Sequence, residues 1–217
     1  MSSMGTFITL EGPDGSGKTT QAHLLVAWLR DQGLPVVQTR EPGGSDIGDQ
    51  IRHVLHDAAN SKMTARTEFL LYSASRAQHV VELILPALSA GSIVVSDRYA
   101  DSSVAYQGHG RGLDLETIKA VTAFATQGVK PDLTLYFDIA AGEGLQRRLL
   151  SGEAWNRMDA EALAFHQRVR NGYLALFDAE PERWEVIDAN RPVEDVQEDV
   201  KAVVKAHLRA DGRYAVQ

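Results

Sequence analysis

Residues Phe7-Ile8-Thr9-Leu10-Glu11-Gly12-Pro13-Asp14-Gly15-Ser16-Gly17-Lys18-Thr19-Thr20 decide the fold of this chain. A short apolar run rich in β-forming residues leads to Gly12, a glycine-rich turn follows, and Lys18 opens an amphipathic helical pattern. This order of strand, loop and helix is the context in which the pattern G-x-x-x-x-G-K-[ST] forms a phosphate-binding loop. Because both flanking elements are present, the match is not a chance run of glycines.

The residue types of this loop suit a nucleoside triphosphate. Gly15 and Gly17 have no Cβ, so the backbone can turn successive N–H groups into one concavity. Lys18 supplies a positive charge at the start of a helix, whose dipole also favours anions, and the Thr19 hydroxyl is the usual Mg²⁺ ligand. The predicted ATP-binding residues are Gly12, Pro13, Asp14, Gly15, Ser16, Gly17, Lys18, Thr19 and Thr20.

Composition limits the class of protein. With 217 residues, of which 44% are hydrophobic and 24% charged, we expect one globular domain over residues 1–217. The net charge of −7 argues against nucleic acid or an acidic membrane as partner and favours a small phosphorylated substrate. There is no cysteine and no apolar run of membrane-spanning length, so we expect a soluble cytoplasmic protein without disulfides.

Apolar runs alternate with helical patterns along the chain, and this alternation predicts an α/β fold. The sheet is expected to be doubly wound and mainly parallel, with five strands and helices on both faces. The predicted strands are 7–10, 36–39, 93–96, 133–138 and 184–188. The predicted helices are 21–31, 47–55, 67–88, 115–127, 142–150, 160–177 and 193–208, and Pro86 should kink or end the third of them.

The residues at the strand ends locate the chemistry. In such sheets ligands bind beyond the carboxyl ends of the strands, where Gly12, Arg40 and Asp97 should meet. Asp97 and Arg98 have two interpretations: a carboxylate that holds Mg²⁺ through water beside a cation for a phosphate, or an ordinary ion pair at the end of a strand. The neighbouring phosphate-binding loop favours the functional interpretation.

Four motifs carry a family resemblance. The run Asp97-Arg98-Tyr99-Ala100-Asp101-Ser102-Ser103-Val104-Ala105-Tyr106-Gln107-Gly108 closely resembles a signature of the thymidylate kinases. The run 39–44 and the spacing Glu68…Tyr72…Arg76 are similar to the bacterial members, and with the loop the resemblance covers about residues 7–200. It implies a P-loop nucleoside monophosphate kinase fold with a short lid, transfer of the γ-phosphate of ATP to dTMP to give dTDP and ADP, Mg²⁺ as cofactor, and a homodimer.

The same resemblance implies which residues hold the sugar and phosphate of dTMP. Asp14 would hydrogen-bond the 3′-hydroxyl, Arg76 and Arg98 would hold the acceptor phosphate, and Arg52 would support it. A planar guanidinium can bind phosphate oxygens bidentately, which makes these roles physically reasonable. Arg76 taken alone would be interpreted as a solvated helix residue.

A second set of residues is implied at the base. Tyr72 would stack on thymine, Ser103 and Gln107 would make polar contacts near the base, and Tyr106 would crowd the 2′ position and disfavour ribonucleotides. Tyr72 taken alone would be a core residue; its position one helical turn from Arg76 favours function.

Catalysis of phosphoryl transfer consists chiefly of in-line positioning and cations on the developing charge. Lys18 and Arg98 are the main protein candidates, with Thr19 and Asp97 at the metal. Asp97 could also orient water on the metal, but the acceptor phosphate is already nucleophilic and needs no committed general base.

A lid over about residues 147–159 would supply a further cation. Some relatives carry an arginine in the loop where this chain has Gly15, so the lid should provide it, from either Arg148 or Arg157. Arg147 could lie against adenine instead. The lid departs from the family pattern, since Ser151 stands before its glycine where relatives have arginine.

Two other functions fit parts of this sequence. Another nucleoside monophosphate kinase or a deoxynucleoside kinase would share the loop and the Asp97-Arg98 pair and differ only in the acceptor. A nucleotide-binding module without turnover is the alternative from another class, although the guanine-recognition and switch motifs of a GTPase are missing.

Overall fold

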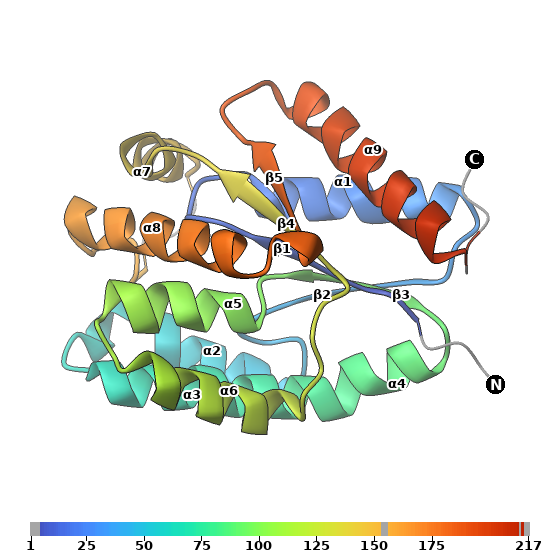
Figure 1. Ribbon diagram of the computed structural model, residues 1–217. Coiled ribbons are helices and arrows are strands. Elements are labelled where there is room, and N and C mark those ends of the chain that lie inside the picture. Colours follow the sequence, from blue (N-terminus) through green and yellow to red (C-terminus); the bar gives the residue numbers. More distant parts are fainter. Residues whose placement is uncertain (1–4, 153–155, 213, 215–217) are drawn as a thin grey trace.

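The computed structural model describes residues 5–152, 156–212 and 214, which form a parallel sheet covered by helices on both faces (Figure 1). The strand order is β2-β3-β1-β4-β5, and every neighbouring pair is parallel. The strands are β1 Phe7–Glu11, β2 Val36–Arg40, β3 Ile93–Asp97, β4 Leu133–Asp138 and β5 Trp184–Asp188. The predicted doubly wound α/β fold is confirmed.

Helical segments connect consecutive strands. The α-helices are α1 Lys18–Asp31, α2 Asp46–His56, α3 Ala65–His79, α4 Leu85–Ser89, α5 Ala100–Ser103, α6 Leu115–Thr126, α7 Ala141–Leu150, α8 Leu163–Ala179 and α9 Val193–Asp211. Two short 3₁₀ turns, η1 Ala58–Asn60 and η4 Pro181–Arg183, and two π-helical segments, η2 Val80–Ile84 and η3 Val104–Gly110, complete the set. Within the described part of the chain, no helix combines the length and apolarity that a bilayer crossing requires.

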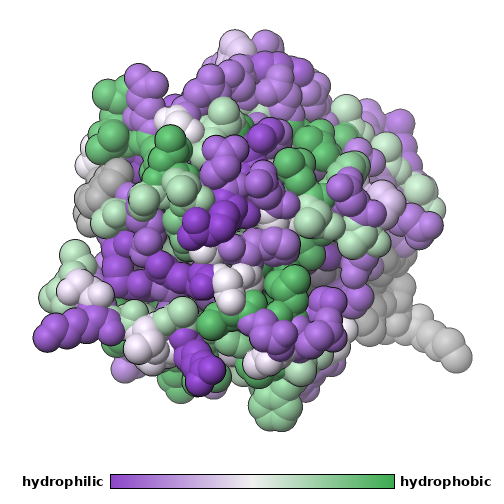
Figure 2. Space-filling view, turned by 60° about the vertical axis from the view of Figure 1, so that its left-hand side comes forward, coloured by the Kyte–Doolittle hydropathy of each residue, from purple (hydrophilic) through white to green (hydrophobic). Residues whose placement is uncertain are grey.

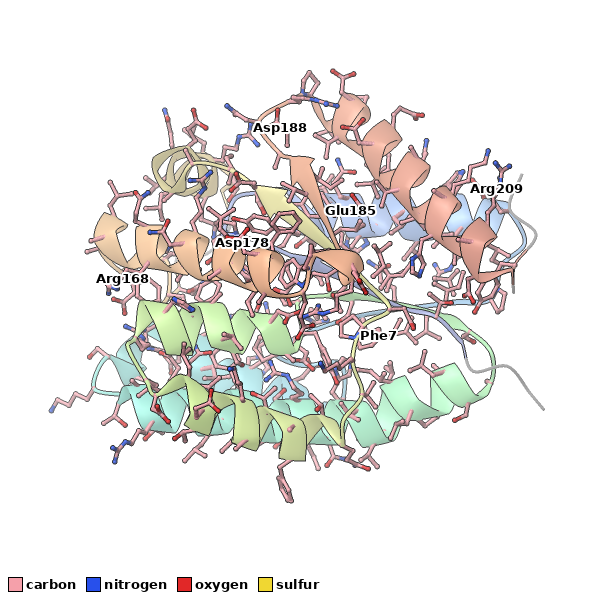
Figure 3. All side chains as sticks on the ribbon, in the orientation of Figure 1. Phe7, Arg168, Asp178, Glu185, Asp188 and Arg209 are labelled. Carbon is pink, nitrogen blue, oxygen red and sulfur yellow. The ribbon has the colours of Figure 1, made fainter. Side chains whose placement is uncertain are left out.

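The sheet separates two apolar layers because alternate side chains of a strand point to opposite faces. Ile8 and Leu10 of β1 belong to the core that includes buried residues of α1 and α9. Phe7, labelled in Figure 3, packs instead with Val80 and Ile84 on the other side of the sheet. Figure 1 shows this division, with α1 and α9 on one side of the sheet and α3, α4 and α6 on the other.

The third predicted helix differs from expectation at Pro86. The helix neither ends nor breaks there, but passes through the π-helical segment η2 and continues as α4 to Ser89. Proline has no N–H for an i→i−4 hydrogen bond, and it is best tolerated in the first turn of a helix. Pro86 lies in the first turn of α4, directly after the widened turn.

The strand ends come together as predicted. Arg40, the last residue of β2, lies opposite Asp97, the last residue of β3, and Asp97 lies opposite Leu10 in β1. The phosphate-binding loop follows β1 directly, so it begins at this same edge, toward which the β4 arrow points in Figure 1. The site is therefore fixed by sheet register.

We predict that Leu25→Ala lowers the free energy of unfolding by about 2–5 kcal/mol, because it leaves a cavity under the sheet. Leu25 of α1 has no exposed surface, whereas the adjacent Leu24 is 38% exposed. Leu24→Ala is the matched control and should cost about 0.5 kcal/mol or less. Urea unfolding followed by circular dichroism measures both, and equal losses would contradict this account of the core.

Candidate active site

A cavity of about 510 Å³ lies at the carboxyl edge of the sheet. It is lined in part by the phosphate-binding loop and the start of α1, through Gly15, Gly17, Lys18, Thr19 and Thr20. Gly12, Pro13 and Ser16 belong to the loop but are not among the lining residues. Figure 2, in which the left-hand side of Figure 1 comes forward, shows hydrophilic residues gathered across the middle of that face.

Lys18 folds back over its own loop. Its Nζ donates to the carbonyl oxygen of Pro13 at 2.6 Å and to Oγ of Ser16 at 3.1 Å. Burial, together with the nearby Arg98, lowers the pKa of Lys18 to about 8. A buried cation whose charge is opposed in this way is a ready partner for an incoming anion.

Gly15 has no room for a side chain. Its φ is +77°, and a Cβ built on it would lie 2.0 Å from the carbonyl oxygen of Gly144 in α7. A Cβ on Gly144 would in turn lie 2.6 Å from the carbonyl oxygen of Asp14. The loop therefore packs directly on the helix that leads into the predicted lid, which is why an arginine cannot stand at this loop position.

Thr19 and Asp97 meet at the cavity edge. The Thr19 hydroxyl donates to Oδ2 of Asp97 at 2.5 Å, and both residues line the cavity. Hydroxyl and carboxylate oxygens are the hard donors that Mg²⁺ prefers. The described residues hold no cluster of three or more His, Asp or Glu that could cage a metal, so these two oxygens fit an ion that takes its remaining ligands from phosphate and water.

Arg98 lies between the loop and the rest of the cavity. Its Nη2 donates to Oδ1 of Asp14 at 2.7 Å and to the hydroxyl of Tyr106 at 3.0 Å, and its Nη1 donates to the hydroxyl of Tyr173 at 3.0 Å. Tyr106 also donates to Oδ2 of Asp14 at 2.8 Å. Burial alone would raise the pKa of Asp14, but Arg98 and Lys18 outweigh it and hold that pKa well below its usual value.

Glu11 is a residue that the sequence analysis did not select. Its carboxylate is fully buried and accepts from the backbone N–H of Tyr99 at 2.7 Å, from Oγ of Ser102 at 2.6 Å and from the hydroxyl of Tyr173 at 2.9 Å. Burial and the nearby Asp101 raise the pKa of Glu11 to about 7. The sequence signal that could have found Glu11 is an acidic residue at the end of an otherwise apolar strand. In the structure, the contacts of Glu11 fix the segment that carries Arg98.

The same cavity is also lined by most of the residues expected at the acceptor. Tyr72, Ser103, Tyr106 and Gln107 line it together with Arg52. Burial and the neighbouring Arg40 lower the pKa of Arg52. Burial and Arg52 likewise lower the pKa of His56 to about 4. His56 is therefore neutral at neutral pH, whereas Arg40 and Arg52 place like charges beside the cavity, where an anion would relieve their repulsion.

Arg76 does not lie where the resemblance led us to expect it. Its side chain is 1% exposed and does not line the cavity. Its Nε donates to Oε2 of Glu41 at 2.7 Å, Nη1 to Oγ of Ser103 at 2.9 Å, and Nη2 to the carbonyl oxygen of Tyr99 at 3.0 Å. All three guanidinium nitrogens of Arg76 are engaged inside the protein, so in this structure the side chain supports Ser103. Its expected role at the acceptor phosphate stays a prediction.

The two candidate lid arginines have different surroundings. Arg148 lines the cavity and pairs with Asp159 at 3.0 Å. Arg157 is not a lining residue; it is buried, and its Nη2 contacts Oε2 of Glu68 at 2.6 Å. Of these two arginines, Arg148 lines the cavity and Arg157 does not, although Arg148 is itself engaged, through Nε and Nη2 with Asp159 and through Nη1 with Ser151. Which of them faces the transferred phosphate stays a prediction.

The rest of the lid is only partly described. Arg147 donates to the carbonyl oxygen of Ala189 at 2.8 Å and to Oδ1 of Asn190 at 3.0 Å, and it also lines the cavity. Asn156 lines the cavity as well. Residues 153–155, which belong to the predicted lid of 147–159, lie outside the described residues.

Comparisons with known proteins agree with this geometry. Residues 10–200 match the family model described as Thymidylate kinase. The chain is 48% identical over 216 residues to a protein named Thymidylate kinase from Roseiflexus sp. (strain RS-1), covering 94% of this chain and 96% of that relative. It is also 48% identical over 217 residues to the protein of that name from Roseiflexus castenholzii, covering 94% and 95% respectively.

A solved structure is similar throughout. The crystal structure of thymidylate kinase from Ehrlichia chaffeensis superposes with a TM-score of 0.76 at 34% sequence identity, covering 93% of this chain and 99% of that one. Sequence and fold thus agree over nearly the full length of the chain, which therefore belongs to the thymidylate kinase family.

Proposed function

We propose that this chain transfers the γ-phosphate of ATP to dTMP, giving dTDP and ADP. The observation that carries the proposal is a single cavity lined by the phosphate-binding loop, by Tyr72 and Gln107, and by Arg98, which contacts Asp14 of the loop. Family membership supports dTMP as the acceptor.

The acceptor phosphate is held by Arg98 with Arg52. Both arginines line the cavity. Among the hydrogen bonds of the described residues, Arg52 donates only from Nη1, to the carbonyl oxygen of Pro42 at 3.0 Å. Asp14 faces the sugar, Tyr72 stacks on the base, and Ser103 and Gln107 contact the base edge. The roles follow from the positive potential at one end of the slot and the aromatic and amide groups at the other.

The chemistry is positioning and charge stabilisation. Lys18 and Arg148, which line the same cavity, stabilise negative charge on the transferred group. Thr19 and Asp97 would hold Mg²⁺, which neutralises phosphate charge and orients the polyphosphate when bound. Residues 147–159 act as a lid that limits access of water to the transferred phosphate.

A substrate panel tests the function directly. Release of ADP, followed by a coupled assay, should depend on dTMP and be slower with dUMP and dCMP and absent with thymidine. A chain that phosphorylated thymidine but ignored dTMP would show that it is a deoxynucleoside kinase, and ATP binding without acceptor-dependent turnover would show a binding module.

We predict that Arg98→Gln lowers kcat/KM for dTMP by about 10²–10³-fold, because a charge-assisted contact to the acceptor phosphate is lost. The dissociation constant for ATP should change by about threefold or less, since loss of Arg98 also relieves the repulsion that lowers the pKa of Lys18. Arg170→Gln is the control: it removes an arginine that pairs with Asp138 at 2.6 Å away from the cavity lining. Equal loss of ATP affinity in Arg98→Gln would argue against the acceptor role.

The pKa of Lys18 predicts a pH profile for ATP. With a pKa of about 8 in the empty site, the ammonium is lost above that pH, and kcat/KM for ATP should fall by about tenfold per pH unit. At saturating ATP the bound phosphates stabilise the ammonium, so kcat should fall only at higher pH. Initial rates between pH 6.5 and 9.5 measure both, and a kcat/KM that stays level to pH 9.5 would contradict the prediction.

We propose that the chain forms a homodimer through α3, η2 and α6. Large apolar side chains are exposed there: Leu70 by 57%, Val81 by 52% and Phe124 by 85%. Leu70 and Val81 are eleven residues, or about three helical turns, apart, so they share one face. A second copy of this surface would cover them.

Phe124→Glu should therefore shift the protein toward monomer, because it puts a charge into the apolar contact. Light scattering after gel filtration at several concentrations measures the mass. Val186→Glu is the control. Val186 is also an exposed apolar residue, at 44%, but it lies on the edge strand β5, outside the proposed interface of α3, η2 and α6. A monomeric wild-type protein, or a dimer unaffected by Phe124→Glu, would contradict this interface.

A further inference from the structure

Glu68 of α3 is a fully buried carboxylate that the proposed chemistry does not use. It receives N–H donors on both oxygens. Oε1 accepts from Nε2 of Gln107 at 2.9 Å and from Nε of Arg111 at 3.1 Å. Oε2 accepts from Nη2 of Arg111 at 2.9 Å and contacts Nη2 of Arg157 at 2.6 Å. A buried carboxylate with this many partners fixes the orientation of each of them.

The contact with Glu68 decides which way the Gln107 amide points. An ionised carboxylate only accepts hydrogen bonds, so the amide nitrogen of Gln107 must face it and the amide oxygen must point away. Burial alone would raise the pKa of Glu68, but hydrogen bonds from Arg111 and Gln107 outweigh it and keep that pKa below its usual value. The carboxylate therefore stays ionised at neutral pH, and the amide cannot turn over without placing two oxygens in contact.

The fixed amide presents an acceptor to the cavity. Gln107 lines the cavity, and no described residue donates to its amide oxygen. A ligand in the slot beside Tyr72 must then offer a hydrogen-bond donor at this point. Thymine and uracil carry an N–H at ring position 3, whereas cytosine has a lone pair there, so an amide oxygen pairs with the first two and repels the third.

We propose that Glu68 is a positioning residue that selects acceptor pyrimidines with an N–H at ring position 3, by holding the amide oxygen of Gln107 toward the base. The inference rests on the proposed function, because it concerns the acceptor site of that reaction. Glu68 itself does not touch the substrate; it acts through the orientation of its neighbour.

The same carboxylate also ties down the lid. Arg157, which belongs to the predicted lid of residues 147–159, donates from Nε to the carbonyl oxygen of Leu55 at 3.2 Å and also contacts Glu68. Arg111 reaches Glu161 at 2.6 Å through its Nη1. A change at Glu68 will therefore also loosen the lid, but that effect lowers the rates with all acceptors alike. The ratio between acceptors separates base selection from lid anchoring.

Glu68→Gln is the deciding variant. Two arginine nitrogens contact Oε2, so the new amide should keep its oxygen there and turn its NH₂ toward Gln107. Gln107 would then invert and present its own NH₂ to the base. We expect the ratio of kcat/KM for dTMP to that for dCMP to fall by about 100-fold, since a matched donor is exchanged for a mismatched one. The ratio for dTMP to dUMP should stay unchanged, because both bases carry the N–H.

Glu161→Gln is the matched control. It removes the other carboxylate of Arg111 and leaves every contact of Glu68 with Gln107 in place. Its dTMP-to-dCMP ratio should equal that of the wild type. Where dCMP is not turned over, its inhibition constant against dTMP replaces kcat/KM. An unchanged ratio in Glu68→Gln, or an equal fall in Glu161→Gln, would overturn the proposal.

A double variant tests whether Glu68 acts through Gln107. Gln107→Met keeps the length of the side chain and removes the amide, so it should lower the dTMP-to-dCMP ratio by itself. Adding Glu68→Gln to Gln107→Met should then lower the ratio no further. An additional fall of the same size in the double variant would mean that Glu68 acts on the base by another route and would overturn the proposal.

Two outcomes need separate measurements. Circular dichroism shows whether Glu68→Gln folds. If it does not, Glu68→Asp is the second variant, because it keeps the charge between the arginines but withdraws the carboxylate from Gln107. Glu68→Asp should also lower the dTMP-to-dCMP ratio, and an unchanged ratio overturns the proposal. A wild-type protein that does not phosphorylate dTMP would overturn the proposed function itself, whereas an active wild type with an unchanged ratio in the variant overturns only the role of Glu68.

Discussion

The guanidinium group of Arg98 is the interaction on which the site depends. Burial alone would lower its pKa, but Tyr106 and Asp14 outweigh burial and keep it charged. Arg98 also has a φ of +72°, a strained conformation for a residue with a side chain. That conformation is held by its N–H on the carbonyl oxygen of Leu10 and by Ser96 on its own carbonyl oxygen at 2.7 Å. The register of the sheet and the contacts of the buried guanidinium together direct the Arg98 side chain toward the phosphate-binding loop.

Much of the fold could be predicted from the sequence because the signals are local. Continuous apolar runs mark strands that are buried on both faces, and the carboxyl ends of such strands must meet at one edge. Arg40 and Asp97 therefore came together as expected. The π-helical segments η2 and η3 could not be predicted from the sequence pattern. No local pattern distinguishes a widened helical turn from a regular one.

The roles of individual arginines were harder to predict, because their partners are distant in sequence. Arg76 is held by Glu41, which is 35 residues away, and Arg157, which lies between α7 and α8, is held by Glu68 of α3. A motif shows that an arginine is present at a given spacing, but not which carboxylate the folded chain brings to it. For Gly15 the sequence showed the difference first, since some relatives carry an arginine at this position. The close contact with Gly144, which leaves no room for a side chain, then explains that difference.

Buried carboxylates thus decide which cations remain for phosphate. The chain as a whole is acidic, with a net charge of −7, yet the cavity is lined by Lys18, Arg40, Arg52, Arg98 and Arg148. Glu41, which lines the cavity, and the buried Glu68 engage Arg76 and Arg157, neither of which lines it, and fix their positions. Arg52 and Lys18 are left with depressed pKa values, which is the condition under which bound phosphate gains most by neutralising them. The anion site proposed for this acidic protein rests on this division between arginines that support the structure and cations that line the cavity.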